Sequence, residues 1–151
     1  MENYQSNQKF LRKSLQANAL FSLLSGAGLA VAAGYLSDIM FVVPIQVFGF
    51  EMGTVLLASG IGILVFAFDV WLISRPVQLN LMQAKLIIAM DILWVVGSAA
   101  VLLLWPDVFT TTGFVSIAIV GVIVAGLAVI ESFGVSTTYE GHSETKEALQ
   151  S

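Results

Sequence analysis

Residues 81–105 read LMQAKLIIAMDILWVVGSAAVLLLW, and this stretch decides the fold. A helix of this length can cross the hydrocarbon core of a bilayer, which takes about 20 apolar residues. Three further apolar runs of similar length lie at about residues 14–35, 51–73 and 113–133. The sequence therefore predicts an all-α integral membrane protein, built as a bundle of four transmembrane helices.

The composition of the 151 residues agrees with this class. Hydrophobic residues make up 58% of the chain and charged residues 11%, whereas a soluble domain has about 45–50% and roughly 25%. The chain has six Lys and Arg and ten Asp and Glu, so its net charge is negative. It therefore has no basic surface that could bind nucleic acid. The absence of Cys and the single His142 exclude thiol chemistry and a His-rich metal or haem site. We expect no cofactor and no nucleic-acid partner.

Breaks in the apolar pattern mark the ends of the predicted spans. Trp71 is followed by Ser-Arg-Pro at residues 74–76, and Trp-Pro-Asp stands at residues 105–107. An aromatic residue at the membrane interface followed by a proline is typical of the end of a span. Residues 37–49 contain Pro44 between apolar side chains. We expect this segment to be a loop that folds back into the interface or against the bundle.

The positions of the cations predict the orientation in the membrane. None of them lies in the connection after the first span or in the connection after the third. The positive-inside rule therefore predicts that the N-terminal segment 1–13 and the polar tail 134–151 are both cytoplasmic. The six cations are Lys9, Arg12, Lys13, Arg75, Lys85 and Lys146.

The N-terminal region also resembles a secretory signal peptide. Cations at residues 9–13 precede an apolar run and the sequence Ala30-Val31-Ala32. The apolar run is roughly 20 residues long, however, whereas the apolar part of a signal peptide has about 7–15. We therefore expect residues 14–35 to remain as a span, and cleavage would leave three spans.

Small residues predict where helices approach one another, because association in lipid depends on close backbone contact. Gly26, Ala30 and Gly34 are spaced four apart and share one face of a helix. We expect the small residues to pack the four helices together, and one face to contact a second copy or another membrane protein in addition. The other small residues of this kind are Gly49, Gly53, Ala58, Gly62, Gly97, Ser98, Ala99, Ala100, Gly121 and Ala125.

Five polar residues in the inner half of the predicted bundle are the candidate site. They are Asn18, Asp69, Lys85, Asp91 and Glu131. A carboxylate in hydrocarbon costs roughly 2.5–3.5 kcal/mol on insertion scales, so such residues face a bundle interior or a wet cavity. Asp91 lies about 15 Å from the inner boundary at 1.5 Å per residue. Asp69 and Glu131 lie near enough to the ends of their spans to reach headgroup water. We expect a polar cluster open toward the cytoplasm, with Lys85 paired to Asp69 or Glu131.

The role of Asp91 is open at this point. A protonated carboxyl group donates a hydrogen bond to a neighbouring helix, which is a structural role. An ionisable group at that depth also binds and releases a proton or a cation, which is a functional role. Trp94 follows three residues later on the same face, so its indole is expected beside the carboxyl.

Short motifs add a resemblance to a known group. Residues 10–15 (FLRKSL), residues 17–22 (ANALFS), Ser25-Gly26, residues 93–95 (LWV) and Ser98 resemble small bacterial integral membrane proteins with four spans and no assigned activity. The resemblance implies the architecture and a multi-pass location in a bacterial plasma membrane, the inner membrane.

The resemblance carries over no catalytic residue. In that group an amide such as Asn stands where this chain has Asp91, which implies a polar contact there rather than a shared ion-binding role. The small multidrug transporters are less similar, because they have an essential Glu in the first span, where this chain has Gln16 and Asn18.

The sequence contains no Ser-His pair, no HExxH motif and no phosphate-binding loop. We therefore expect the protein to have no enzymatic activity. The first hypothesis is a structural or accessory membrane protein that works through helix contacts and its tail. The alternative is a small oligomeric carrier coupled to protons or cations, with Asp91 as the ion-binding group.

Overall fold

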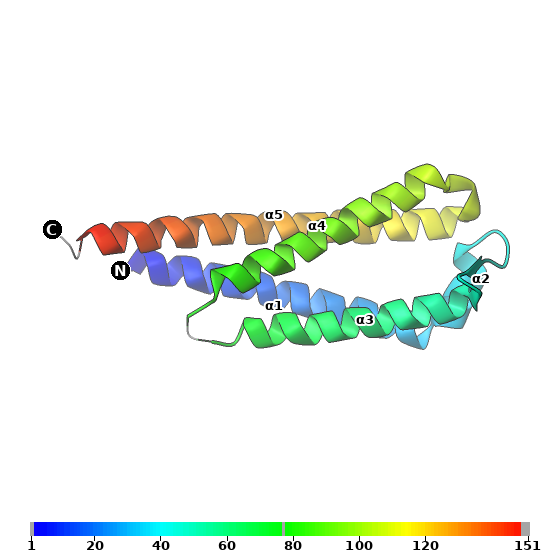
Figure 1. Ribbon diagram of the computed structural model, residues 1–151, viewed down its shortest axis with the longest axis horizontal. Helices are drawn as coiled ribbons and strands as arrows, with labels where there is room; N and C mark the ends of the chain where they lie inside the picture. The colour runs from blue at the N-terminus through cyan, green and yellow to red at the C-terminus, as the bar shows by residue number, and fades with distance from the viewer. Residues whose placement is uncertain (1, 77, 149–151) are drawn as a thin grey trace.

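The computed structural model describes residues 2–76 and 78–148 and is helical over most of its length. Its elements are α1 (Glu2–Val31), α2 (Ala33–Met40), β1 (Gln46–Val47), β2 (Phe50–Glu51), α3 (Met52–Ile73), α4 (Leu81–Leu104), the 3-10 helix η1 (Pro106–Val108) and α5 (Thr111–Ala148). Within the described residues, four segments are long and apolar enough to cross a membrane: Gln5–Val31, Met52–Ile73, Leu81–Leu104 and Thr111–Tyr139. The four long helices lie lengthwise beside one another, with both chain ends at the same end of the bundle (Figure 1).

The connection between α3 and α4 contains local interactions that end one helix and begin the next. The guanidinium of Arg75 lies 3.5 Å from the centre of the Trp71 ring. The side chain of Asn80 caps α4 by accepting a hydrogen bond from the Met82 backbone N–H at 2.9 Å. These local signals explain why α3 and α4 begin and end within one residue of the expected spans.

The first apolar run differs from the expected single span over residues 14–35. The helix bends at Ala32, where φ is −101° and ψ is 14°. Hydrogen bonds from Ala32 N to Gly28 O and from Leu36 N to Ala32 O continue the helical pattern on both sides of the bend. The chain therefore continues as α2, through the first four residues of the expected loop 37–49.

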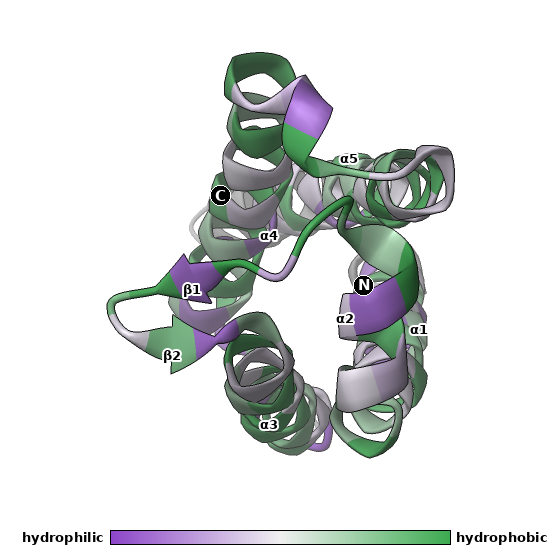
Figure 2. Ribbon diagram, turned by 90° about the vertical axis from the view of Figure 1, so that its right-hand side faces the viewer, coloured by the Kyte–Doolittle hydropathy of each residue, from purple (hydrophilic) through white to green (hydrophobic). Residues whose placement is uncertain are grey.

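After Met40 the chain folds back against the connection between α4 and α5. Phe41 forms an isolated β-bridge with Phe109, and their ring centres are 5.2 Å apart. Thr110 N donates to Met40 O at 2.9 Å. The β1–β2 hairpin that follows projects to the side of the bundle, at the end opposite the chain termini (Figure 2). Its turn places Phe48 and Gly49 at positive φ, and Phe48 is 97% exposed.

The segment expected as a polar tail continues the last helix. α5 passes through Gly134 without a break and extends to Ala148. A Cβ at Gly134 would meet Leu11 at 3.1 Å, so this glycine allows α1 and α5 to pack closely. The hydroxyl of Thr138 donates to Gly134 O at 2.7 Å and stays within the helix. The expected polar tail 134–151 is therefore helical as far as Ala148, and residues 149–151 lie outside the described range.

Close packing joins α1 to α3 through small residues. A Cβ at Gly60 would lie 2.6 Å from the backbone nitrogen of Ala30 and 2.9 Å from the carbonyl oxygen of Gly26. Gly26 and Ala30 were expected at such a contact, whereas Gly60 was not. A Cβ at Gly62 or Gly121 would meet nothing within 4 Å, so these two glycines have no close neighbour in the described chain.

The best-packed part of the bundle lies at the end that carries the chain termini. It is an apolar cluster of buried side chains from α1, α3, α4, α5 and the α3–α4 connection. The other half of the bundle is more open, because α3 packs mainly on α1 and α4 packs mainly on α5. The buried members of this cluster, named here the apolar plug, are Leu11, Leu15, Ala19, Val70, Leu79, Ala84, Ile87, Ile88 and Val135.

Candidate functional site

Three of the predicted polar residues meet in the bundle interior. Asn18 comes from α1, Asp91 from α4 and Glu131 from α5. The amide nitrogen Nδ2 of Asn18 donates to Asp91 Oδ2 at 2.6 Å and to Glu131 Oε1 at 2.9 Å. A carboxylate oxygen accepts and does not donate, so the –NH₂ side of the amide is the side that fits between two carboxylates. One amide group therefore links three helices.

The site is closed off by the surrounding side chains. Glu131 is fully buried, Asn18 is 1% exposed and Asp91 is 4% exposed. Glu131 Oε2 is buried with no hydrogen-bond partner. Within the described part of the chain, no ion pair joins a cationic side chain to either carboxyl group. The interior thus holds two acidic groups, and the two N–H groups of one amide are the donors that they share.

The arrangement is suited to holding one mobile positive charge. Two uncompensated carboxylates this close to one nitrogen would repel each other and would each lack most of their hydration. A proton on the pair removes one negative charge and supplies an O–H donor. The oxygen Oε2 of Glu131, which has no partner, is an atom at which such a proton can reside. The pair can therefore take up and release a proton as a unit.

The other two predicted residues lie elsewhere. Asp69 and Lys85 are exposed on α3 and α4 and take no part in the buried cluster. Within the described residues there is no ion pair between Lys85 and either Asp69 or Glu131. The sequence suggested that Glu131 lies close to the end of its span, but α5 continues to Ala148 and the side chain of Glu131 is fully buried.

The polar cluster is closed on the side where the sequence suggested an opening. The apolar plug lies between the carboxyl groups and the end of the bundle that carries the chain termini, with Leu15 and Val135 each within a turn or so of the cluster. The expected opening toward the termini is therefore filled by packed side chains. The opposite side of the cluster faces the more open half of the bundle.

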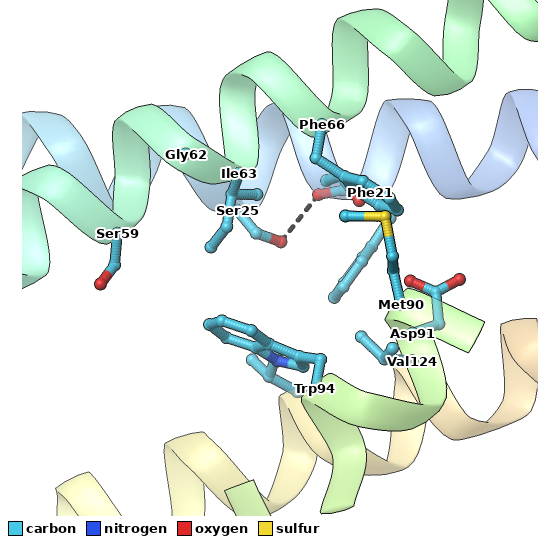
Figure 3. A pocket seen from close by; sticks show the side chains of 12 residues that line it. Phe21, Ser25, Ser59, Gly62, Ile63, Phe66, Met90, Asp91, Trp94 and Val124 are labelled. Carbon is cyan, nitrogen blue, oxygen red and sulfur yellow. Dashed lines mark hydrogen bonds between the residues drawn. The ribbon is translucent and has the colours of Figure 1, made fainter. Parts of the chain in front are cut away.

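A cavity of about 320 Å³ lies on that open side, and Asp91 forms part of its wall. Aromatic rings from three helices line it: Phe21 of α1, Phe66 of α3 and Trp94 of α4. Figure 3 shows Asp91 at one end of this space and Ser59 toward the other, with the Trp94 ring alongside. Trp94 thus lines the same cavity as Asp91. A second cavity of about 800 Å³ shares Ser25, Ser59 and Trp94 with the first and extends to α2.

Ser22 belongs to the site, although sequence reasoning did not single it out. Its hydroxyl donates to Asn18 Oδ1 at 3.2 Å and lies at the cavity wall. The spacing in the sequence could have identified Ser22, because a serine four residues after a buried asparagine lies on the same helical face. With this bond, both the oxygen and the nitrogen of the Asn18 amide have partners, which holds its orientation.

No protein-family model, no curated protein and no solved structure matches the chain.

Proposed function

We propose that this chain is a multi-pass membrane protein without enzymatic activity, and that it works as a small carrier coupled to protons. The observation that carries the proposal is the buried pair Asp91 and Glu131, which shares the amide of Asn18 and leaves Glu131 Oε2 without a partner. The proton binds to this pair and is exchanged through the cavity beside Asp91.

The four long apolar helices support insertion in a bilayer. Their outer faces carry large exposed apolar side chains, among them Leu93, Leu103 and Val122, each more than 70% exposed. Such surface is stable against lipid and unfavourable against water. The distribution of the six cations supports cytoplasmic termini. The resemblance to small bacterial four-span proteins supports the bacterial inner membrane as the location.

The second carboxyl group favours the carrier over a purely structural or accessory protein. A structural link between α1 and α4 needs one donor and one acceptor, which Asn18 and Asp91 already provide. Glu131 adds a second acid, and an additional buried acid without a cation costs stability in hydrocarbon. An ionisable pair beside a cavity is explained more simply by reversible proton binding.

A second copy of the chain is the partner that we propose within the membrane. Gly121 of α5 and Ala125 four residues later share one face of the helix. A Cβ at Gly121 would meet nothing within 4 Å, so this face has room for the close approach of another helix. A single bundle of this size has little room for the two access states of a carrier, which is a further reason to propose an oligomer.

Infrared difference spectroscopy on the reconstituted protein tests the proton site directly. A pH change should alter the carboxylic C=O band of the wild-type protein. Glu131→Gln and Asp91→Asn should each change this band, and the double variant should remove the buried component. Asp69→Asn is the matched control, because it removes an exposed acid outside the cluster and should leave the buried component intact.

Proton flux should follow the same pattern. In proteoliposomes with an internal pH dye, an imposed voltage or solute gradient should move protons through the wild-type protein and through Asp69→Asn, but not through the double variant. Thermal melting of each variant shows whether it is folded. A buried band that does not respond to pH, or equal flux in a folded double variant, would contradict the proposal and favour the accessory protein.

A further inference from the structure

The cavity beside Asp91 has the chemistry of a binding site for a cation rather than for a neutral or anionic molecule. Among the described residues that line it, Asp91 is the only one with a charged side chain. Phe21, Phe66 and Trp94 supply aromatic surface from three helices. Aromatic faces attract cations, and an acidic group among such faces is a common way to recognise an ammonium group.

The hydroxyl groups in the wall point to the same class of ligand. Ser22 donates its proton to Asn18 Oδ1, Ser25 donates to Phe21 O at 2.7 Å, and Ser59 donates to Val55 O at 2.8 Å. Each hydroxyl proton is therefore used within its own helix, and each oxygen can still accept a hydrogen bond. These hydroxyl oxygens accept beside one carboxyl group, which matches a ligand that donates N–H groups.

The size of the cavity limits the ligand. Its volume of about 320 Å³ is near the lower end of the roughly 300–1,000 Å³ typical of small-molecule sites. Apart from Asp91, the serine hydroxyls and the indole N–H of Trp94, the lining is apolar. A small amine with one hydrocarbon or aromatic group would fill the space and present its ammonium group to Asp91.

We propose that this cavity binds a small hydrophobic amine in its ammonium form, held by Asp91 and by the faces of Phe21, Phe66 and Trp94. The inference rests on the proposed function, because the proton and the ammonium group use the same acidic pair. When the amine binds, the pair releases its one proton to water, and the positive charge of the ammonium group replaces that of the proton. When the amine leaves, the pair takes up a proton again. The net charge of the site is unchanged in both steps.

Isothermal titration of the purified protein with 2-phenylethylammonium tests the proposal. Two comparison ligands of similar size are 2-phenylethanol, which is neutral, and 3-phenylpropionate, which is an anion. The ammonium should bind at least about tenfold more tightly than either, because only it can pair with the carboxylate and the aromatic faces. Repeating the titration in buffers of different ionisation enthalpy should show release of up to one proton for each amine bound.

Three variants locate the site. Asp91→Asn should weaken binding by about tenfold or more, while Asp69→Asn should bind like the wild type. Gly62→Leu provides a test that does not alter the hydrogen-bonded cluster. Gly62 lines the cavity, and a Cβ there would meet nothing within 4 Å, so the larger side chain can occupy the cavity itself. It should abolish amine binding and leave the buried carboxyl band unchanged.

The outcomes separate this inference from the proposed function. Equal binding of the alcohol and the ammonium, or equal binding by Asp91→Asn and Asp69→Asn, would overturn the amine site. If the carboxyl band responds to pH but no amine binds, the amine site is wrong and the proton site stands. If the amine binds through Asp91 without proton release, the cation site stands and the coupling to protons is wrong.

Discussion

Asn18 is the residue on which the interior site depends, because its amide group is shared by two acids. The two N–H groups point to different helices, and the oxygen accepts from Ser22 on the helix that carries Asn18. A substitution at this position therefore affects both carboxyl groups at once. By contrast, loss of either acid leaves the amide with one carboxyl partner.

Asn18→Val should lower the free energy of unfolding by about 1–3 kcal/mol, because buried acceptors lose their donor. Gln16→Val is the matched control, since Gln16 is an exposed amide on the same helix. Reversible unfolding in mixed micelles measures the difference. A loss in Asn18→Val no greater than that in Gln16→Val would show that the shared amide contributes little to stability.

The sequence placed Asn18, Asp91 and Glu131 inside the bundle, but it also placed Asp69 and Lys85 there. The helices are apolar on nearly every side, so periodicity does not distinguish the face toward the interior from the face toward lipid. A polar residue then shows which face of its helix points to the interior only when its partner is known. Burial of Glu131 depends on the packing of α5 against α1, which no local pattern shows.

At the scale of the elements, the sequence predicts helix ends well where the signal is local. The break at Trp105-Pro106 is such a signal, and α4 ends at Leu104, one residue before the expected end of the span. The bend at Ala32 and the continuation of α5 through Gly134 were not predicted. Both depend on contacts with other helices: Gly134 approaches Leu11 of α1, and α2 packs on α3 and α5 beyond the bend.

The contact between α1 and α3 gives a prediction at this scale. Gly60→Ala should destabilise the bundle by about 1–3 kcal/mol, because the added methyl group would meet the backbone of α1, which cannot move aside as a side chain can. Gly62→Ala, two residues away, should change stability by less than about 0.5 kcal/mol. Thermal melting of both variants measures the difference, and equal melting temperatures would contradict close packing at Gly60.

Thr110 gives a second prediction for the elements, at the end opposite the termini. Its hydroxyl donates to Ile39 O at 2.6 Å and accepts from Gly113 N at 3.1 Å, so it caps α5 and holds α2 beside it. Thr110→Val should cost about 0.5–2 kcal/mol. It should also speed hydrogen exchange at the Val42 amide, which is bonded to Val108 O.

Thr112→Val is the control, because Thr112 is at an exposed position. It should change neither the stability nor the exchange rate at Val42. Unchanged exchange in Thr110→Val would mean that the cap does not hold this contact.

The whole molecule has two ends of different character. One end carries both termini and the apolar plug. The other carries α2, the β1–β2 hairpin and the larger cavity, which reaches α2. If the termini are cytoplasmic, the cavity lies on the outer side of the polar cluster and the plug lies on its inner side. A carrier would then have to loosen the plug to release its ligand inward, which makes the orientation of the chain decisive for the mechanism.

Labelling of single cysteines tests that orientation, and the chain suits the method because it has no native cysteine. Phe48→Cys lies at the exposed hairpin and Ser6→Cys near the N-terminus. A maleimide that does not cross membranes should label Phe48→Cys in intact cells and Ser6→Cys only after the cells are opened, because the cations hold the termini inside.

Leu93→Cys is the control for insertion. Its side chain is 71% exposed in the middle of α4, and in lipid it should stay unlabelled until denatured. Labelling of Ser6→Cys in intact cells would show the opposite orientation, and the cavity would then lie on the cytoplasmic side of the polar cluster.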